Sequence, residues 1–93
     1  MKIEVALSSE QPRTLKLKGR MAWAMVELAN AGPTGVTSIT RPAPRWSGYV
    51  FDLRALGVPI KTIMEPHEGN FPGQHARYVL TCGASVQLLD GQA

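Results

Sequence analysis

The sequence has a single cysteine, no long apolar run and no block of acidic residues, and these absences exclude several classes of protein. Because Cys82 has no second cysteine to pair with, the chain is not a disulfide-stapled secreted domain. No apolar run approaches the roughly 20 residues that cross a membrane, and the first residues lack the pattern of a signal peptide. We therefore expect a cytoplasmic protein without a membrane partner.

The motifs of enzymes and metal sites are also missing. The sequence contains no glycine motif that cradles phosphate, no nucleophile elbow and no paired carboxylates in an evident cleft. Potential metal ligands gather in the C-terminal part, but their spacing fits no zinc pattern: Glu65, His67, Glu68, His75 and Cys82. We therefore expect neither catalysis nor a cofactor, a metal or a small-molecule substrate.

What remains is a short and mildly basic chain. Its 93 residues are enough for one small domain, and 44% apolar with 18% charged residues favours a packed core over disorder. The net charge is +3. Basic residues precede two expected helices and flank an expected hairpin, at Lys16, Lys18, Arg20, Arg41, Arg45, Lys61 and Arg77. This distribution favours a polyanionic partner.

The first third of the chain predicts strands and then a helix. Apolar and polar residues alternate from Lys2 to Leu7, which predicts a strand. Leu15 and Leu17 alternate with lysines and either form another strand or lead into the helix that follows. Good helix formers occupy 20–31, and Gly32-Pro33 is a strong stop signal.

A second helix is predicted from Pro44 to Leu56. Proline suits the first helical position, and Gly57 ends the segment. Between the two helices, Thr34 to Pro42 leaves room for one helical turn capped by Thr37.

The last third predicts a hairpin. Two runs of β character, Val58–Glu65 and Arg77–Cys82, are joined by the turn-forming segment 66–76, which gives a hairpin with a projecting tip. The residues from Ser85 to Leu89 add a last short strand.

This order of elements is that of an α+β winged helix-turn-helix domain, with a compact helical core, an N-terminal strand and a C-terminal hairpin as the wing. We expect one domain over 1–93. Its parts are an N-terminal strand and lead-in at 1–18, a helix-turn-helix at 20–57, a wing hairpin at 58–82 and a C-terminal strand or tail at 83–93.

The predicted second helix has one buried and one exposed face. At 100° per residue, an apolar stripe forms from Trp46, Tyr49, Val50, Leu53 and Leu56. The opposite face consists mostly of small residues, which would let the helix axis approach base edges: Pro44, Ser47, Gly48, Phe51, Asp52 and Ala55, with Arg45 and Arg54 at its edges. In a winged helix-turn-helix domain this helix enters the major groove of double-stranded DNA.

Ten residues are candidates for DNA contact. Arg45 suits guanine or a phosphate, Ser47 suits either a base or a phosphate, and Arg41 suits a phosphate. Phe51 could touch a thymine methyl, support a dimer or cover the edge of the core. The full set is Arg41, Arg45, Ser47, Gly48, Phe51 and Arg54 around the helix, and Lys61, Asn70, His75 and Arg77 on the hairpin. The simpler alternative for each is a solvated surface position.

Three segments of the chain resemble a family of short winged helix proteins that is common in alphaproteobacterial genomes and their prophages. They are 23–33, 42–54 and 65–80, and their distinctive parts are Pro-Arg-Trp-Ser at 44–47 and His-Ala-Arg-Tyr at 75–78. The resemblance implies a winged helix fold and a role in DNA binding. The chain differs from an ordinary helix-turn-helix domain in one respect, because the segment 37–41 before the second helix is short.

The leading hypothesis is a small DNA-binding regulator of phage or mobile-element genes, which would bind as a homodimer or in tandem. An excisionase-like protein that bends DNA is an alternative within the same chemistry. A winged helix that binds another protein is the rival hypothesis, and it explains the apolar Phe51 and Phe71 better than DNA does.

Overall fold

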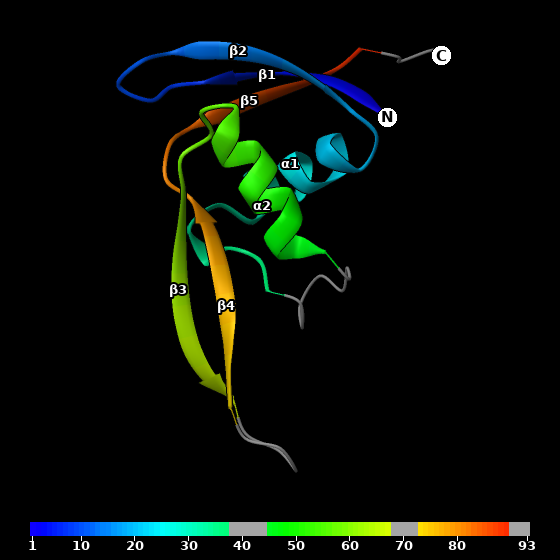
Figure 1. The fold of residues 1–93 in the computed structure, drawn as a ribbon. Coiled ribbons are helices and arrows are strands. Elements are labelled where there is room, and N and C mark those ends of the chain that lie inside the picture. The colour runs from blue at the N-terminus through cyan, green and yellow to red at the C-terminus, as the bar shows by residue number, and fades with distance from the viewer. Residues whose placement is uncertain (38–44, 68–72, 90–93) are drawn as a thin grey trace.

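The computed structural model describes residues 1–37, 45–67 and 73–89, which form two antiparallel sheets and two α-helices (Figure 1). The elements in chain order are β1 (Lys2–Leu7), β2 (Arg13–Lys18), α1 (Gly19–Ala31), the short 3-10 helix η1 (Gly32–Thr34), α2 (Trp46–Ala55), β3 (Ile60–His67), β4 (Gly73–Leu80) and β5 (Ala84–Leu88).

The first and last strands of the chain belong to one sheet, whose strand order is β2-β1-β5. In this sheet Val5 lies opposite Leu15 on one side and Val86 on the other. Alternate side chains of β1 face the core, where Ile3, Val5 and Leu7 are buried. The predicted N-terminal strand is therefore confirmed, and of the two alternatives for Leu15 and Leu17 the strand is correct.

Helix α1 forms the centre of the core. It spans Gly19–Ala31, one residue longer than predicted, and buries Ala22, Ala24, Met25 and Leu28. The chain leaves the helix at Gly32, whose φ of 56° lies in the left-handed region that favours glycine. The predicted stop at Gly32-Pro33 is confirmed.

Helix α2 is shorter than predicted at both ends. Arg45 is its N-cap with an extended φ of −133°, so the helix begins at Trp46, and Pro44 lies outside the described residues. Trp46, Val50 and Leu53 are buried as expected. The prediction was wrong for Leu56, which is 41% exposed. The helix ends at Ala55, so Leu56 does not continue the buried stripe, and the chain then turns away at Gly57.

The hairpin ladder lies closer to the tip than predicted, because β3 begins at Ile60 rather than Val58 and β4 ends at Leu80 rather than Cys82. Strands β3 and β4 pair from Ile60 opposite Leu80 out to His67 opposite Gly73. The turn prediction for 66–76 was wrong at both ends, because Pro66 pairs with Gln74 within the ladder. A proline is tolerated there because a two-stranded sheet has only edge strands.

An isolated β-bridge ties the segment after η1 to this hairpin. Val36 exchanges two backbone hydrogen bonds of 2.9 Å with Tyr78 on β4. The helical turn predicted within Thr34–Pro42 is matched only in part, because η1 covers Gly32–Thr34 and Val36 then lies in the bridge. Thr37, the predicted cap, is buried, and 38–44 lie outside the described residues.

Figure 1 shows how these parts are arranged. The sheet of β1, β2 and β5 lies at one end of the molecule, α1 and α2 lie below it, and the β3–β4 hairpin projects from the opposite end. The N-terminus of α2 points toward the same end as the hairpin. Neither described helix has the length and apolar character to cross a membrane.

Candidate functional site

The first turns of α2 present a polar and weakly apolar face to solvent. Arg45 and Ser47 are exposed, and Phe51 is 72% exposed one turn further on. The helix start has no side-chain cap and no acidic residue in its first turn. The positive end of the helix dipole therefore favours an anionic group near Arg45 and Ser47.

Gly48 lies beside the arginine that precedes the helix. A Cβ atom at Gly48 would lie 3.9 Å from both Nε and one terminal nitrogen of Arg45, which is ordinary van der Waals contact. The guanidinium group therefore lies next to Gly48. Arg45, Ser47 and Gly48 form one continuous surface, which with Phe51 we call the α2 face.

Aromatic rings beneath the α2 face fix it to the rest of the protein. Trp46 is 3% exposed and lies between Trp23 of α1 and Tyr78 of β4, with ring centroids 5.4 and 6.5 Å away. Arg20 donates a 3.0 Å hydrogen bond to the Tyr49 hydroxyl and lies 5.2 Å above the Trp23 ring. In the sequence Arg20 stands out only as a basic residue, because its aromatic partners lie up to 29 residues away along the chain.

Arg54, at the last turn of α2, is held by β3. Its Nε and one terminal nitrogen donate to the Ile60 carbonyl at 3.1 and 2.7 Å, and that terminal nitrogen also lies 2.7 Å from the Thr62 hydroxyl. At the same helix end, Arg13 of β2 donates to the Leu56 carbonyl at 3.1 Å. Both arginines satisfy backbone carbonyls and set the helix against its neighbours.

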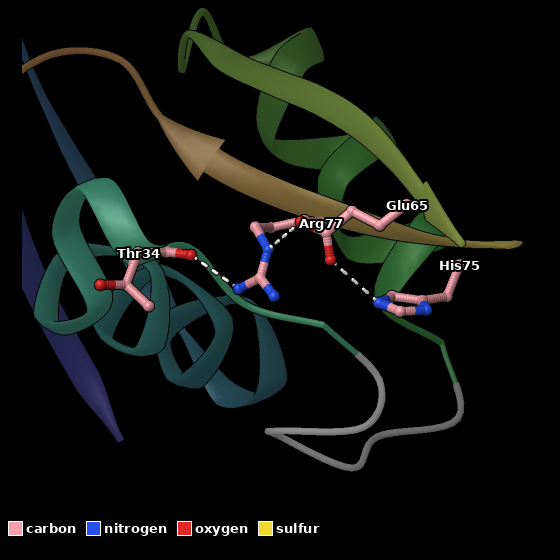
Figure 2. A network of polar contacts seen from close by, with 4 residues as sticks. All are labelled: Thr34, Glu65, His75 and Arg77. Carbon is pink, nitrogen blue, oxygen red and sulfur yellow. Dashed lines mark hydrogen bonds and ion pairs between the residues drawn. The ribbon is translucent and has the colours of Figure 1, made fainter. Parts of the chain in front are cut away.

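Arg77 and His75 of β4 belong to a polar network shown in Figure 2. Arg77 Nε donates a 2.6 Å hydrogen bond to Glu65 Oε2, and its Nη1 donates a 2.8 Å hydrogen bond to the Thr34 carbonyl of η1. His75 Nε2 lies 3.1 Å from the other oxygen of Glu65. Since Thr34 closes the 3-10 helix after α1, this network ties the hairpin to the helical core.

The network makes the attachment of the hairpin dependent on pH. The hydrogen bond from Arg77 holds the pKa of Glu65 below its usual 4.5 despite partial burial, with the charge of Arg77 and the contact with His75 acting in the same direction. A depressed carboxyl pKa stabilises the folded state above the unfolded pKa, and that contribution is lost as the pH falls through the folded value.

We therefore expect lower amide protection in β3 and β4, measured as the exchange rate relative to the intrinsic rate at the same pH, when the pH is lowered below about 4.5. Glu65→Gln is expected to show the lower protection already at neutral pH and to lose this pH dependence. Glu10→Gln, in the exposed loop between β1 and β2, is the matched control and should behave as the wild type. Equal protection of the hairpin in the wild type and Glu65→Gln at neutral pH would contradict the role given to Glu65.

The structure brings together some of the candidate DNA-binding residues and separates others. Arg45, Ser47, Gly48 and Phe51 share the α2 face, and Lys61 is exposed on β3. Three other candidates make hydrogen bonds within the chain, a role that the sequence did not indicate: Arg54, His75 and Arg77. Arg41 and Asn70, like Phe71, lie outside the described residues.

The partner of Arg77 was within reach of sequence reasoning. Glu65 and Arg77 lie two pairs apart in the hairpin register, on the same face of neighbouring strands. The predicted hairpin already ends its two strands at Glu65 and Arg77, on either side of the segment 66–76. The ligand-like residues of this region form no metal cluster within the described part, which contains no group of three His, Cys, Asp or Glu side chains placed to hold an ion.

Comparison with known proteins agrees with this architecture. The family model described as a winged helix domain matches residues 14–90, which leaves out β1, the loop after it, the first residue of β2 and the last three residues. Neither the curated proteins nor the solved structures contain a match to the chain. Because the match extends over far more than half of the sequence, the chain belongs to the winged helix domain family.

Proposed function

We propose that this protein binds double-stranded DNA with the α2 face in the major groove and the β3–β4 hairpin as a wing on the backbone or in the minor groove. Winged helix domains are in general DNA-binding modules, and this geometry is their usual mode. On this proposal the protein is a small transcriptional regulator of phage or mobile-element genes. The excisionase-like role in bending DNA uses the same surface.

The observation that carries the proposal is the start of α2. An exposed arginine lies beside a serine and a glycine at a helix N-terminus that has neither a side-chain cap nor an acidic residue. The glycine allows close approach, the arginine and serine can donate to phosphates or base edges, and the dipole favours the anion. This helix end and the hairpin project toward the same end of the molecule, so that one duplex could contact both (Figure 1).

A second function is favoured by exposed apolar residues on α2 and on the hairpin. Phe51 is 72% exposed on α2, and Met64 is 56% exposed on β3. Apolar side chains at these positions suit a protein partner as well as thymine methyl groups. The rival proposal is therefore a winged helix that binds another protein through the α2 face.

A salt titration separates the two proposals. Affinity for a mixed-sequence duplex is measured by fluorescence anisotropy at about 50 and 200 mM salt, where release of counterions weakens DNA binding steeply. Arg45→Ala is expected to cost about 1–3 kcal/mol of binding free energy. Lys16→Ala removes the same charge from β2 in the sheet at the other end of the molecule and should have little effect.

Two outcomes would contradict the proposal. If no complex forms even at low salt, DNA is not the partner, and the protein-binding alternative remains. If Lys16→Ala weakens binding and Arg45→Ala does not, DNA lies on the three-stranded sheet rather than on the α2 face.

A further inference from the structure

The strand β5 forms an open edge of the three-stranded sheet. In the described part of the chain the sheet order ends at β5, and four of its five residues are exposed. Figure 1 shows this strand beside β1, on the side away from β2. An exposed edge strand offers unpaired backbone groups to another strand, which proteins usually prevent with charged residues, proline or a bulge.

The alternation of hydrogen bonds between β1 and β5 shows which backbone groups of β5 point to the open edge. Leu89 N–H donates to the Lys2 carbonyl at 2.9 Å, and Ser8 N–H donates to the Gly83 carbonyl at 3.0 Å. Because antiparallel strands alternate, the residues of β5 that bond to β1 are the odd-numbered ones. The N–H and C=O groups of Ala84, Val86 and Leu88 therefore point to the open edge.

These three positions are symmetric about Val86, and this makes the edge complementary to itself. If a second copy of β5 lies antiparallel across a two-fold axis at Val86, Val86 faces Val86 of the second copy and Ala84 faces Leu88. Each of these facing pairs then exchanges two backbone hydrogen bonds. This register places the two-fold axis at the centre of β5. It is also the register in which the N–H and C=O groups of Ala84, Val86 and Leu88 all find partners.

The side chains fit the same pairing. Ala84, Val86 and Leu88 lie opposite the buried residues of β1, on the face toward the helices, yet Val86 is 37% and Leu88 58% exposed. Across the two-fold axis these apolar side chains would cover one another. On the outer face, Ser85 would lie opposite Gln87 of the second copy, which is a polar pair.

The distribution of charge selects this edge over the other one. The sequence of β5 is Ala-Ser-Val-Gln-Leu, without a charged residue or a proline. The opposite edge strand, β2, carries Arg13, Lys16 and Lys18 and would repel a second copy of itself. We propose that the protein forms a symmetric homodimer by antiparallel pairing of β5 with β5 of a second copy, which joins the two sheets into one. This proposal does not depend on DNA binding.

Sedimentation analysis of the free protein tests the proposal over a series of concentrations up to millimolar. We expect the wild type to reach twice the 10.1 kDa mass of the chain. Val86→Lys, which places two charges face to face at the axis, is expected to be monomeric. Thr14→Lys adds the same charge to the other edge and should stay dimeric. A wild type that is monomeric at every concentration, or a dimeric Val86→Lys, would overturn the proposal.

Val86→Pro tests the backbone pairing itself. The proline removes an N–H that points to the open edge and none that bonds to β1, so the monomer fold is retained. Circular dichroism checks that fold, and a monomer with wild-type spectra is the expected result. A folded Val86→Pro protein that still dimerises would overturn the proposal.

Mixed cross-linking fixes the register. On a Cys82→Ser background, Ser85→Cys and Gln87→Cys chains are oxidised separately and as a mixture. Facing positions would have Cα atoms ~4.5 Å apart, within disulfide range, whereas two copies of position 85 would be roughly 8 Å apart. Covalent dimer is expected mainly in the mixture, and equal yields in all three samples would exclude this register.

Discussion

Replacing Trp46 with alanine is expected to lower the free energy of unfolding by about 3–5 kcal/mol. The indole is 3% exposed and contacts the rings of Trp23, Tyr49 and Tyr78, so its removal leaves a cavity among α1, α2 and β4. A small domain has about 5–15 kcal/mol of stability in total, so the loss is a large part of it. Urea denaturation followed by circular dichroism measures the change.

Phe51→Ala is the matched control for this substitution. It removes a large aromatic ring from the same helix, but this ring is 72% exposed. A change within about 0.5 kcal/mol is therefore expected. If Phe51→Ala destabilises the protein as much as Trp46→Ala, the assignment of the buried and exposed faces of α2 is wrong.

Replacing Gly35 with alanine is the second substitution with a large expected effect, a loss of about 2–6 kcal/mol. Its φ of 73° and ψ of −177° lie in a region essentially restricted to glycine, which costs an L-residue about 1–3 kcal/mol. A Cβ atom would also lie 2.6 Å from the Tyr78 carbonyl oxygen and 2.7 Å from Val79 Cγ2, and overpacking of this kind costs about 1–3 kcal/mol. The clash would separate Val36 from Tyr78 and loosen the hairpin.

Gly32→Ala separates the two contributions. Gly32 has a similar φ of 56°, but no atom lies within 4 Å of the position that its Cβ would take. Only the backbone cost of about 1–3 kcal/mol is expected there. Equal losses at the two glycines in urea denaturation would mean that the close approach between Gly35 and β4 contributes nothing.

Local signals in the sequence were sufficient for the presence of the two helices. Helix α1 ends at Ala31, just before its stop signal at Gly32, and Trp46, Val50 and Leu53 lie on the buried stripe expected from helical periodicity. Arg45, Ser47 and Phe51 are exposed where that periodicity places them. Each of these predictions depends on residues within one or two helical turns of each other.

Contacts between distant segments were not predictable in the same way. The pairing of β5 with β1 joins the two ends of the chain, and nothing in either strand specifies its partner. Arg54 and Arg77 look like solvated cations in sequence, but tertiary contacts bring carbonyl oxygens within their reach. The extent of the hairpin ladder was misjudged because Pro66 and Gly73 are turn formers that an edge ladder tolerates.

The two proposed surfaces lie at different ends of the molecule. The β5 edge belongs to the sheet at one end, whereas the start of α2 and the hairpin point toward the other (Figure 1). A dimer formed through β5 would therefore leave both copies of the α2 face accessible. Symmetric DNA-binding dimers of this kind recognise two half-sites in a palindromic arrangement.

The most direct test of DNA binding by the α2 face is to map the amide NMR shifts while duplex DNA is added. We expect the largest changes at Ser47, Gly48 and Phe51 and along β3 near Lys61. Amides of β1 and β2, in the sheet at the opposite end, should change little. Shifts centred on β1 and β2, or no shifts at low salt, would contradict the proposal that α2 enters the groove.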